Sequence, residues 1–212
     1  MYQGVHNVEA SPDIPRRLPR GTHGLDPSLV AASQRARLLE AAGHAVAEKV
    51  YAAATIDDIV RGAGVSKKTF YEHFDDKLGC FLAAYEAASD ELFDHVTAAQ
   101  DGAEPGVART RAGIQAYLRW LAAEPALARV FLIEIAAAGP EALECRERLR
   151  DRYADRMRAL QRRDVPDEMF HAVVAAADDL VVRRLRAGGD VRELEPVLLE
   201  LQLALLRGPV RR

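Results

Sequence analysis

The residues most capable of chemistry in this sequence lie in one short stretch, from position 66 to position 73. Hydroxyl, ammonium, phenol and imidazole groups gather there, and Glu72 is the only acid among them. Such groups donate hydrogen bonds to phosphate oxygens and to base edges in the major groove of DNA. The donors of this stretch are Ser66, Lys67, Lys68, Thr69, Tyr71 and His73.

The surrounding residues predict two short helices joined by a tight turn. Thr55-Ile-Asp-Asp58 is close to a capping box and opens the first of them, while Ser66 is the expected N-cap of the second, over residues 67–74. Gly64 gives the turn a conformation that a residue with a Cβ would resist. The helices can pack on each other through Ile56, Ile59, Val65, Phe70 and Phe74. This arrangement is a helix-turn-helix that leaves the donors on its outer face.

Positive charge is concentrated in the same region although the whole chain carries a formal net charge of −3. A DNA-binding function therefore requires a local basic patch. Every lysine of the chain falls nearby, at Lys49, Lys67, Lys68 and Lys77, and the cations elsewhere are arginines. Lysine is a compact point charge suited to phosphate. Codon bias with chance clustering is the alternative explanation.

The segment from Ala63 to Lys77 resembles the helix-turn-helix signature of the TetR family of repressors, of TetR/AcrR type. It reads Ala-Gly-Val-Ser-Lys-Lys-Thr-Phe-Tyr-Glu-His-Phe-Asp-Asp-Lys. The motif lies within about the first third of the chain, and the remainder resembles the family only in architecture. The resemblance implies an all-α fold of about nine helices, with an N-terminal three-helix DNA-binding domain and a helical ligand-binding and dimerisation domain.

The resemblance also implies a role for each donor. Residues at the start of the third helix would face the groove, and the phenol and imidazole would bridge to the DNA backbone. One residue at the start of the second helix and one at the start of the fourth would contact phosphate. The predicted DNA-binding residues are Thr55, Ser66, Lys67, Lys68, Thr69, Tyr71, His73 and Lys77. The alternatives are that Tyr71 packs against the first helix and that His73 is a solvated surface residue.

One departure from the family pattern lies at the end of the first helix. Val50 stands where the family often has glycine. Because a β-branched residue resists positive φ, we expect the first helix to end differently here.

Prolines and glycines mark the boundaries between the predicted segments of the chain. Residues 1–26 are predicted to be a disordered arm, 27–75 the helix-turn-helix domain, 76–207 the regulatory and dimerisation domain, and 208–212 a tail. Basic residues in the arm at Arg16, Arg17 and Arg20 could reach a minor groove, although a solvated tail is the preferred interpretation. Within the second domain, one helix is expected from Pro125 to about Gly139 and one from about Val191 to Leu206.

The last two predicted helices carry wide apolar stripes at helical spacing. Two such helices can pair with two from a second copy to form a four-helix bundle, which would also place two recognition helices over two DNA half-sites. The predicted homodimer contacts are Phe170, Val173, Val174, Ala177, Val181, Leu194, Leu198, Leu201 and Leu205. The alternative is that these stripes serve only the core of one chain.

Family members commonly hold a small-molecule inducer among helices four to eight, and its binding moves the fourth helix and the DNA-binding domain. Aromatic residues and methionine often line such sites. The candidate lining residues are Phe93, Tyr117, Trp120, Phe131, Tyr153 and Met157. Each of them could equally be a plain core residue.

Enzyme and metal functions are not favoured by the sequence. Neither a histidine or cysteine pair at metal-ligand spacing nor a glycine-rich phosphate loop is present, so no cofactor or metal is expected. The two cysteines and the absence of a signal peptide or bilayer-length apolar stretch predict a cytoplasmic protein without membrane contact. The sequence therefore predicts a dimeric repressor released from operator DNA by a small molecule. A transcriptional activator or ligand-independent regulator of the same fold is the alternative, and a helical protein-binding adaptor is a third interpretation.

Overall fold

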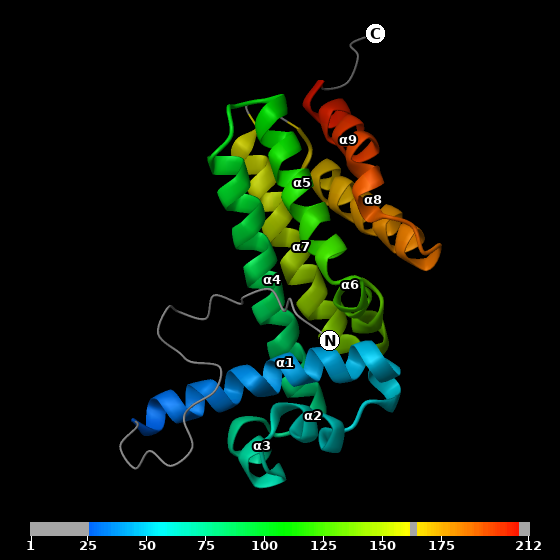
Figure 1. Ribbon diagram of the computed structural model, residues 1–212. Coiled ribbons are helices and arrows are strands. Elements are labelled where there is room, and N and C mark those ends of the chain that lie inside the picture. Colours follow the sequence, from blue (N-terminus) through cyan, green and yellow to red (C-terminus); the bar gives the residue numbers. More distant parts are fainter. Residues whose placement is uncertain (1–25, 162–164, 208–212) are drawn as a thin grey trace. The chain divides into compact units, whose positions relative to one another are not determined.

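The computed structural model describes residues 26–161 and 165–207, with side chains as far as Ala204 (Figure 1). These residues form α-helices and two short 3₁₀ helices, and no strand occurs among them, which confirms the predicted all-α fold. None of the helices in this part of the chain is long and apolar enough to cross a membrane. The arm predicted for residues 1–26 lies outside the described residues except for Asp26, and so does the tail predicted for 208–212.

The border predicted after residue 75 stays a prediction, and the chain forms two compact units that divide within one helix, between Tyr85 and Glu86. This helix is α4, Lys77–Asp101. Its first turns belong to the first unit because Cys80 and Phe81 are buried there, at 0% and 2% exposure.

The first unit contains α1, Pro27–Ala53, α2, Ile56–Ala63, and α3, Lys67–His73, followed by the start of α4. The Asp26 carboxylate caps α1 by accepting a hydrogen bond of 2.9 Å from the Ser28 backbone N–H. Helix α1 packs on both α2 and α3. The fully buried members of this core include Leu38, Ala42, Ile59, Phe70 and Cys80.

The end of α1 corrects one sequence-based expectation. We expected a valine to avoid positive φ at this position, but Val50 has φ +62° and ψ 158°. The final turn is closed by a hydrogen bond of 3.1 Å from the Ala54 N–H to the Val50 carbonyl. Holding a β-branched residue in this conformation costs about 1–3 kcal/mol.

The second unit begins with the rest of α4 and continues through five α-helices and two 3₁₀ segments. These are α5, Val107–Ala123; α6, Pro125–Leu132; η1, Glu134–Ala138; α7, Pro140–Leu160; α8, Asp167–Arg186; η2, Val191–Leu194; and α9, Glu195–Arg207. The helix expected from Pro125 to about Gly139 is thus divided into α6 and η1, and the one expected from Val191 into η2 and α9.

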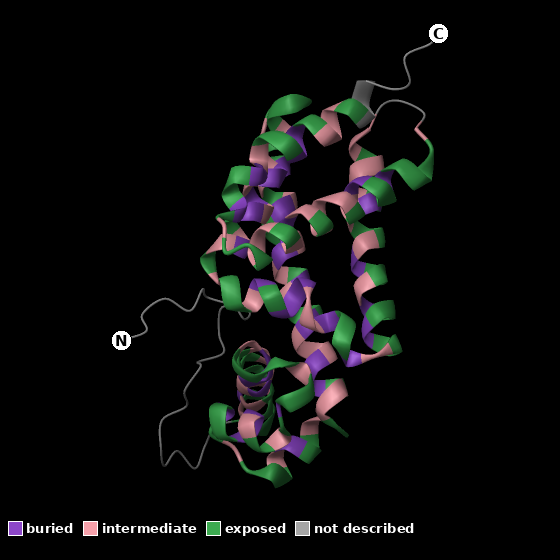
Figure 2. Cartoon of the chain, turned by 90° about the vertical axis from the view of Figure 1, so that its right-hand side faces the viewer, coloured by how far each residue is buried: buried purple, intermediate pink, exposed green. Residues whose placement is uncertain are grey.

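The core of the second unit is built from one face of each helix, as the burial colouring in Figure 2 shows. Helix α5 packs on α6 and α9, and α8 packs on α6, α7 and α9. The largest fully buried side chains here are Leu92, Leu118, Leu121, Ile135, Phe170 and Val181.

Candidate nucleic-acid interface

A capping box opens α2, as the spacing of Thr55 and Asp58 predicts. The Asp58 N–H donates to Thr55 Oγ1 over 3.2 Å, and the Thr55 N–H donates to Asp58 Oδ2 over 3.1 Å. The Thr55 hydroxyl also donates to Asp58 Oδ2 over 2.7 Å. The two bonds donated by backbone N–H groups satisfy donors that a helix start would otherwise leave without acceptors. The Thr55 hydroxyl, for which a phosphate contact was predicted, is thus already engaged with Asp58.

Asp58 additionally joins α2 to α1. Its Oδ1 accepts from Lys49 Nζ over 2.7 Å and from an Arg61 nitrogen over 3.2 Å. The hydrogen bonds from Lys49 and Thr55 hold the pKa of the Asp58 carboxyl well below its ordinary range. Lys49, one of the clustered lysines, is therefore committed to a contact within the protein.

The turn between α2 and α3 follows the prediction made from Gly64. This residue has φ +63° and ψ 40°, the left-handed conformation that glycine adopts without strain. The Arg37 side chain of α1 donates to the Ala63 carbonyl over 2.9 Å. The turn is thus fixed both by its own backbone and by a side chain from α1.

Helix α3 divides into an anchored inner side and an exposed outer side. The Ser66 hydroxyl accepts from the Thr69 N–H over 3.0 Å, and the two hydroxyl oxygens of these residues lie 3.0 Å apart. Phe70 is fully buried, and its ring centroid lies 5.4 Å from that of Tyr71 in an edge-to-face pair. Because Phe70 fixes the rotation of α3, Tyr71 stays 55% exposed.

The two lysines of α3 are exposed and each has an acidic neighbour. Lys67 Nζ lies 2.8 Å from Asp57 Oδ1 of α2. Lys68 Nζ lies 3.9 Å from Glu72 Oε1, and the Lys68 side chain is 88% exposed. Both ammonium groups can therefore meet a phosphate from outside, but Lys67 would have to exchange a direct ionic hydrogen bond for it.

Lys77 and His73 turn toward α1. Lys77 Nζ donates to the backbone carbonyls of Tyr51 over 2.8 Å and of Ala54 over 3.0 Å. His73 Nε2 lies 3.4 Å from Gln34 Oε1 and the residue is partly buried. Contacts of these two residues with DNA stay predictions.

Sequence reasoning missed two residues of this surface. Asp57 was not separated from its neighbours in the capping sequence, and Arg37 was not singled out on α1. The signal available for Asp57 was its position in the first turn of α2, where an acid is favoured near the helix N-terminus. Its pairing with Lys67 carries no sequence signal.

Comparison with known proteins identifies the type of helix-turn-helix. Residues 38–84 match the family model described as bacterial regulatory proteins, tetR family. Residues 38–84 therefore carry a tetR-family helix-turn-helix. The match contains all of α2 and α3 and ends within α4, so it covers the helix-turn-helix described above.

Proteins with similar sequences include both an activator and a repressor of transcription. The HTH-type transcriptional activator FasR of Mycolicibacterium smegmatis is 34% identical over 88 residues, which are 42% of this chain and 40% of FasR. The chain thus aligns with less than half of the length of that relative. The HTH-type transcriptional repressor AcnR of Corynebacterium diphtheriae is 27% identical over 173 residues, covering 78% of this chain and 87% of AcnR.

A solved structure shares the fold. The transcriptional regulator FadR of Bacillus subtilis, in complex with stearoyl-CoA, superposes with a TM-score of 0.72 at 16% identity. The superposition covers 80% of this chain and 97% of FadR. At this identity the similarity establishes the fold alone.

The six candidate ligand-lining residues form separate contacts in the second unit. The ring centroids of Phe93 and Tyr153 lie 5.2 Å apart, and Arg152 lies 4.4 Å over the Phe93 ring. Trp120 and Phe131 form a second pair, with centroids 5.5 Å apart. Met157 packs against a buried cluster of Ala154, Phe170 and Val173.

Tyr117, the remaining candidate, belongs to a polar cluster. Its hydroxyl donates to Asp178 Oδ1 over 3.3 Å. Asp178 Oδ2 accepts from Arg150 Nε over 2.9 Å and lies 3.6 Å from an Arg146 nitrogen. All three charged side chains are at most 20% exposed. The cluster therefore ties α5, α7 and α8 together through one carboxylate.

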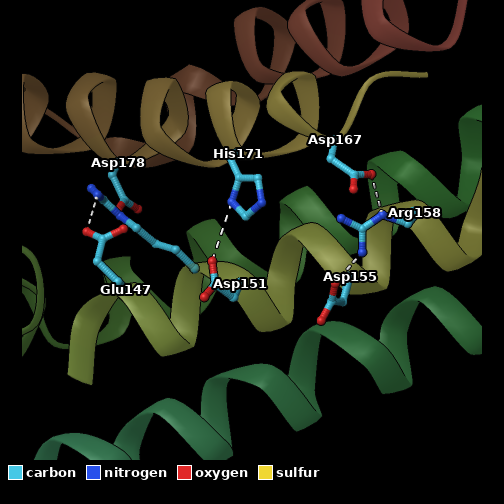
Figure 3. Close-up of polar contacts among 8 residues, drawn as sticks. Glu147, Asp151, Asp155, Arg158, Asp167, His171 and Asp178 are labelled. Atoms are coloured by element: carbon cyan, nitrogen blue, oxygen red, sulfur yellow. Dashed lines mark hydrogen bonds and ion pairs between the residues drawn. The ribbon is translucent and has the colours of Figure 1, made fainter. Parts of the chain in front are cut away.

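Further acid–base pairs line the junction of α7 and α8 (Figure 3). His171 Nδ1 lies 3.5 Å from Asp151 Oδ1, and Arg158 Nε donates to Asp167 Oδ1 over 2.8 Å. Arg158 also pairs with Asp155 of its own helix. These charges alternate in sign and pair with each other, and no cluster able to hold a metal ion occurs among the described residues.

Most of the predicted dimer residues serve the core of their own chain. Five are buried, at no more than 6% exposure: Phe170, Val173, Val181, Leu194 and Leu198. Val174, Ala177 and Leu201 are partly exposed, and the side chain of Leu205 lies outside the described residues. Val197, which was not selected, is 51% exposed on α9. Contact of these residues with a second copy stays a prediction.

Proposed function

We propose that this protein is a transcriptional regulator that binds operator DNA through the outer face of α3. The observation that carries the proposal is the anchoring of α3 by buried Phe70, which leaves Lys67, Lys68 and Tyr71 outside. This face offers ammonium and phenol donors to phosphates and base edges. The match to the tetR-family model supports the proposal because the matched segment contains the whole motif.

The regulator acts as a homodimer. A helix-turn-helix protein gains specificity by placing two recognition helices over two half-sites one DNA turn apart. Apolar side chains left partly or largely exposed on α8 and α9, namely Val174, Ala177 and Val197, support pairing through these helices. The buried residues of the same helices hold that surface in place.

A small molecule releases the protein from DNA, so that it functions as a repressor. The relative aligned over 78% of this chain, AcnR, is a repressor. FadR, which shares the fold, forms a complex with stearoyl-CoA, and this supports an effector bound in the second unit. The aromatic pairs Phe93–Tyr153 and Trp120–Phe131 are the candidate contacts. Activation is the second candidate, since FasR is an activator.

The test is fluorescence anisotropy with a duplex selected from random DNA, at two salt concentrations. Tyr71→Ala should weaken binding by about 1–3 kcal/mol if the phenol contacts a base. Lys68→Ala should weaken binding and make the slope of log K against log salt shallower by about one unit, because one phosphate contact is lost. Arg183→Ala removes an exposed cation from the second unit and is the matched control.

Two results would overturn the proposal. One is a selection that enriches no sequence. The other is binding of the wild-type protein that neither Tyr71→Ala nor Lys68→Ala changes more than Arg183→Ala does.

A further inference from the structure

One exposed cation of the DNA-facing surface already has a partner within the protein. Lys67 is the first residue of α3, and its ammonium lies 2.8 Å from a carboxylate oxygen of Asp57 in the first turn of α2. The two side chains are 56% and 58% exposed. The hydrogen bond that the Lys67 ammonium donates to Asp57 also raises the pKa of Lys67, which keeps the ammonium protonated. The pair is therefore a direct ionic contact at the surface where DNA is proposed to bind.

The neighbouring lysine is held differently. Lys68 lies 3.9 Å from Glu72, beyond direct hydrogen-bond distance, and is 88% exposed. Lys68 can bind phosphate without giving up a hydrogen bond, whereas Lys67 must leave Asp57. Exposed ion pairs are weak, so a phosphate in the right position can replace the Asp57 carboxylate.

We infer that Asp57 is an internal competitor of DNA phosphate for Lys67 and thereby limits the affinity of the protein for DNA. The inference rests on the proposed function. When Lys67 moves to a phosphate, the DNA releases a cation, but the vacated Asp57 carboxylate lies beside the phosphates and retains one. The net release of ions is then close to zero. Since non-specific binding is essentially electrostatic, an internally paired lysine contributes little to it.

The test compares wild type with Asp57→Asn, which keeps the size of the side chain and removes its charge. Asp57→Asn should raise the affinity for a random duplex by up to about fivefold, the factor that an exposed ion pair accounts for. It should also steepen the salt slope by about 0.9, since one additional counter-ion is released. The thermal midpoint of each variant should be recorded to show that it is folded.

A double-mutant cycle distinguishes competition by Asp57 for Lys67 from a general effect of net charge on DNA binding. In the Lys67→Ala background, Asp57→Asn should lose most of its effect on affinity and on salt slope, because the lysine through which it acts is gone. Glu40→Gln, an exposed acid on α1 of the same unit, makes the same change in net charge and is the control. It should leave both quantities close to those of wild type.

The outcomes distinguish the two proposals. If no variant binds any duplex in a salt-dependent manner, the proposed function fails and the competitor with it. If wild type binds duplex DNA but Asp57→Asn changes neither the affinity nor the salt slope, only the inference about Asp57 is overturned. The inference is also overturned if Asp57→Asn has the same effect on affinity and salt slope with and without Lys67.

Discussion

The ammonium of Lys77 lies 4.2 Å from the ring centroid of Tyr51 and donates a hydrogen bond of 2.8 Å to the carbonyl of the same residue. A second bond, to the Ala54 carbonyl, is 3.0 Å long. Lys77 thus closes the C-terminal end of α1 from the first turn of α4. The sequence motif predicted a phosphate contact for this lysine, and the structure adds a role in holding the DNA-binding unit together.

Replacing Lys77 by methionine should destabilise the first unit by about 2–3 kcal/mol. The change keeps most of the apolar stem but removes a cation–π contact and two hydrogen bonds from a charged donor. Hydrogen exchange at the amides of the last turn of α1 would measure the loss. Lys68→Met, at an 88% exposed position, should have almost no effect on stability. Normal protection in Lys77→Met, combined with weakened DNA binding, would leave Lys77 with the phosphate role alone.

Replacing Val50 by glycine should stabilise the protein by about 1 kcal/mol. Relief of the strain at φ +62° should stabilise the folded state by about 1–3 kcal/mol. The greater flexibility of glycine in the unfolded chain should offset about 0.5–1 kcal/mol of this. The midpoint of urea unfolding should therefore rise. Ala53→Gly, in the last turn of the same helix, should lower the midpoint of urea unfolding. A lower midpoint for Val50→Gly would mean that this conformation carries no net strain.

Stability of the first unit should fall in acid because of Asp58. Its pKa in the folded protein lies below the ordinary value of 3.8, so the unfolded chain binds more protons between the two values. The stabilisation by Asp58 is then fully present above the ordinary pKa and is lost as the pH falls below it. Urea unfolding between about pH 6 and pH 2 should show a shallower pH dependence for Asp58→Asn than for wild type. Glu40→Gln should retain the wild-type dependence.

Replacing Asp178 by alanine should destabilise the second unit by about 2–3 kcal/mol. The change removes the acceptor shared by Tyr117 and Arg150 and leaves two largely buried guanidinium groups without this counter-ion. Urea unfolding followed by fluorescence reports on this unit, since the one tryptophan of the chain is Trp120 on α5. Asp179→Ala, which removes an exposed pair with Arg183, should change stability by less than about 0.5 kcal/mol. Equal effects of the two variants would contradict the role given to the cluster.

Replacing Val197 by lysine should weaken the proposed dimer at least about tenfold, a change of about 1.4 kcal/mol. This valine is half exposed on α9, and a charge there would have to be desolvated in an interface. Sedimentation equilibrium would measure the dissociation constant. Leu143→Lys, at an exposed apolar position on α7, is the matched control and should leave it unchanged. An unaltered constant for Val197→Lys would remove this residue from the interface.

Sequence patterns were most informative where structure is local. Thr55 and Ser66 cap the helices that they were expected to cap, Gly64 takes the left-handed turn, and Phe70 is buried beneath the exposed donors. Each of these features depends on residues within one helical turn of each other, so residue types and spacing suffice to predict them.

Apolar periodicity predicted helices but not which surface covers each apolar stripe. The stripes on α8 and α9 are present, but Phe170, Val181 and Leu198 fill the core of their own chain. An apolar face indicates that something covers it and does not indicate what. In the same way, Val50 keeps a positive φ because the surrounding structure holds it there, against its own preference.

By itself, the sequence determined the all-α class and the helix-turn-helix, because these depend on short-range spacing and capping. Tertiary structure alone decided that Lys67 meets Asp57, that Lys77 closes α1, and that Asp178 gathers a tyrosine and two arginines. The partners in these contacts come from different helices. Which charge finds which partner is therefore set by how the helices pack, and no local pattern encodes it.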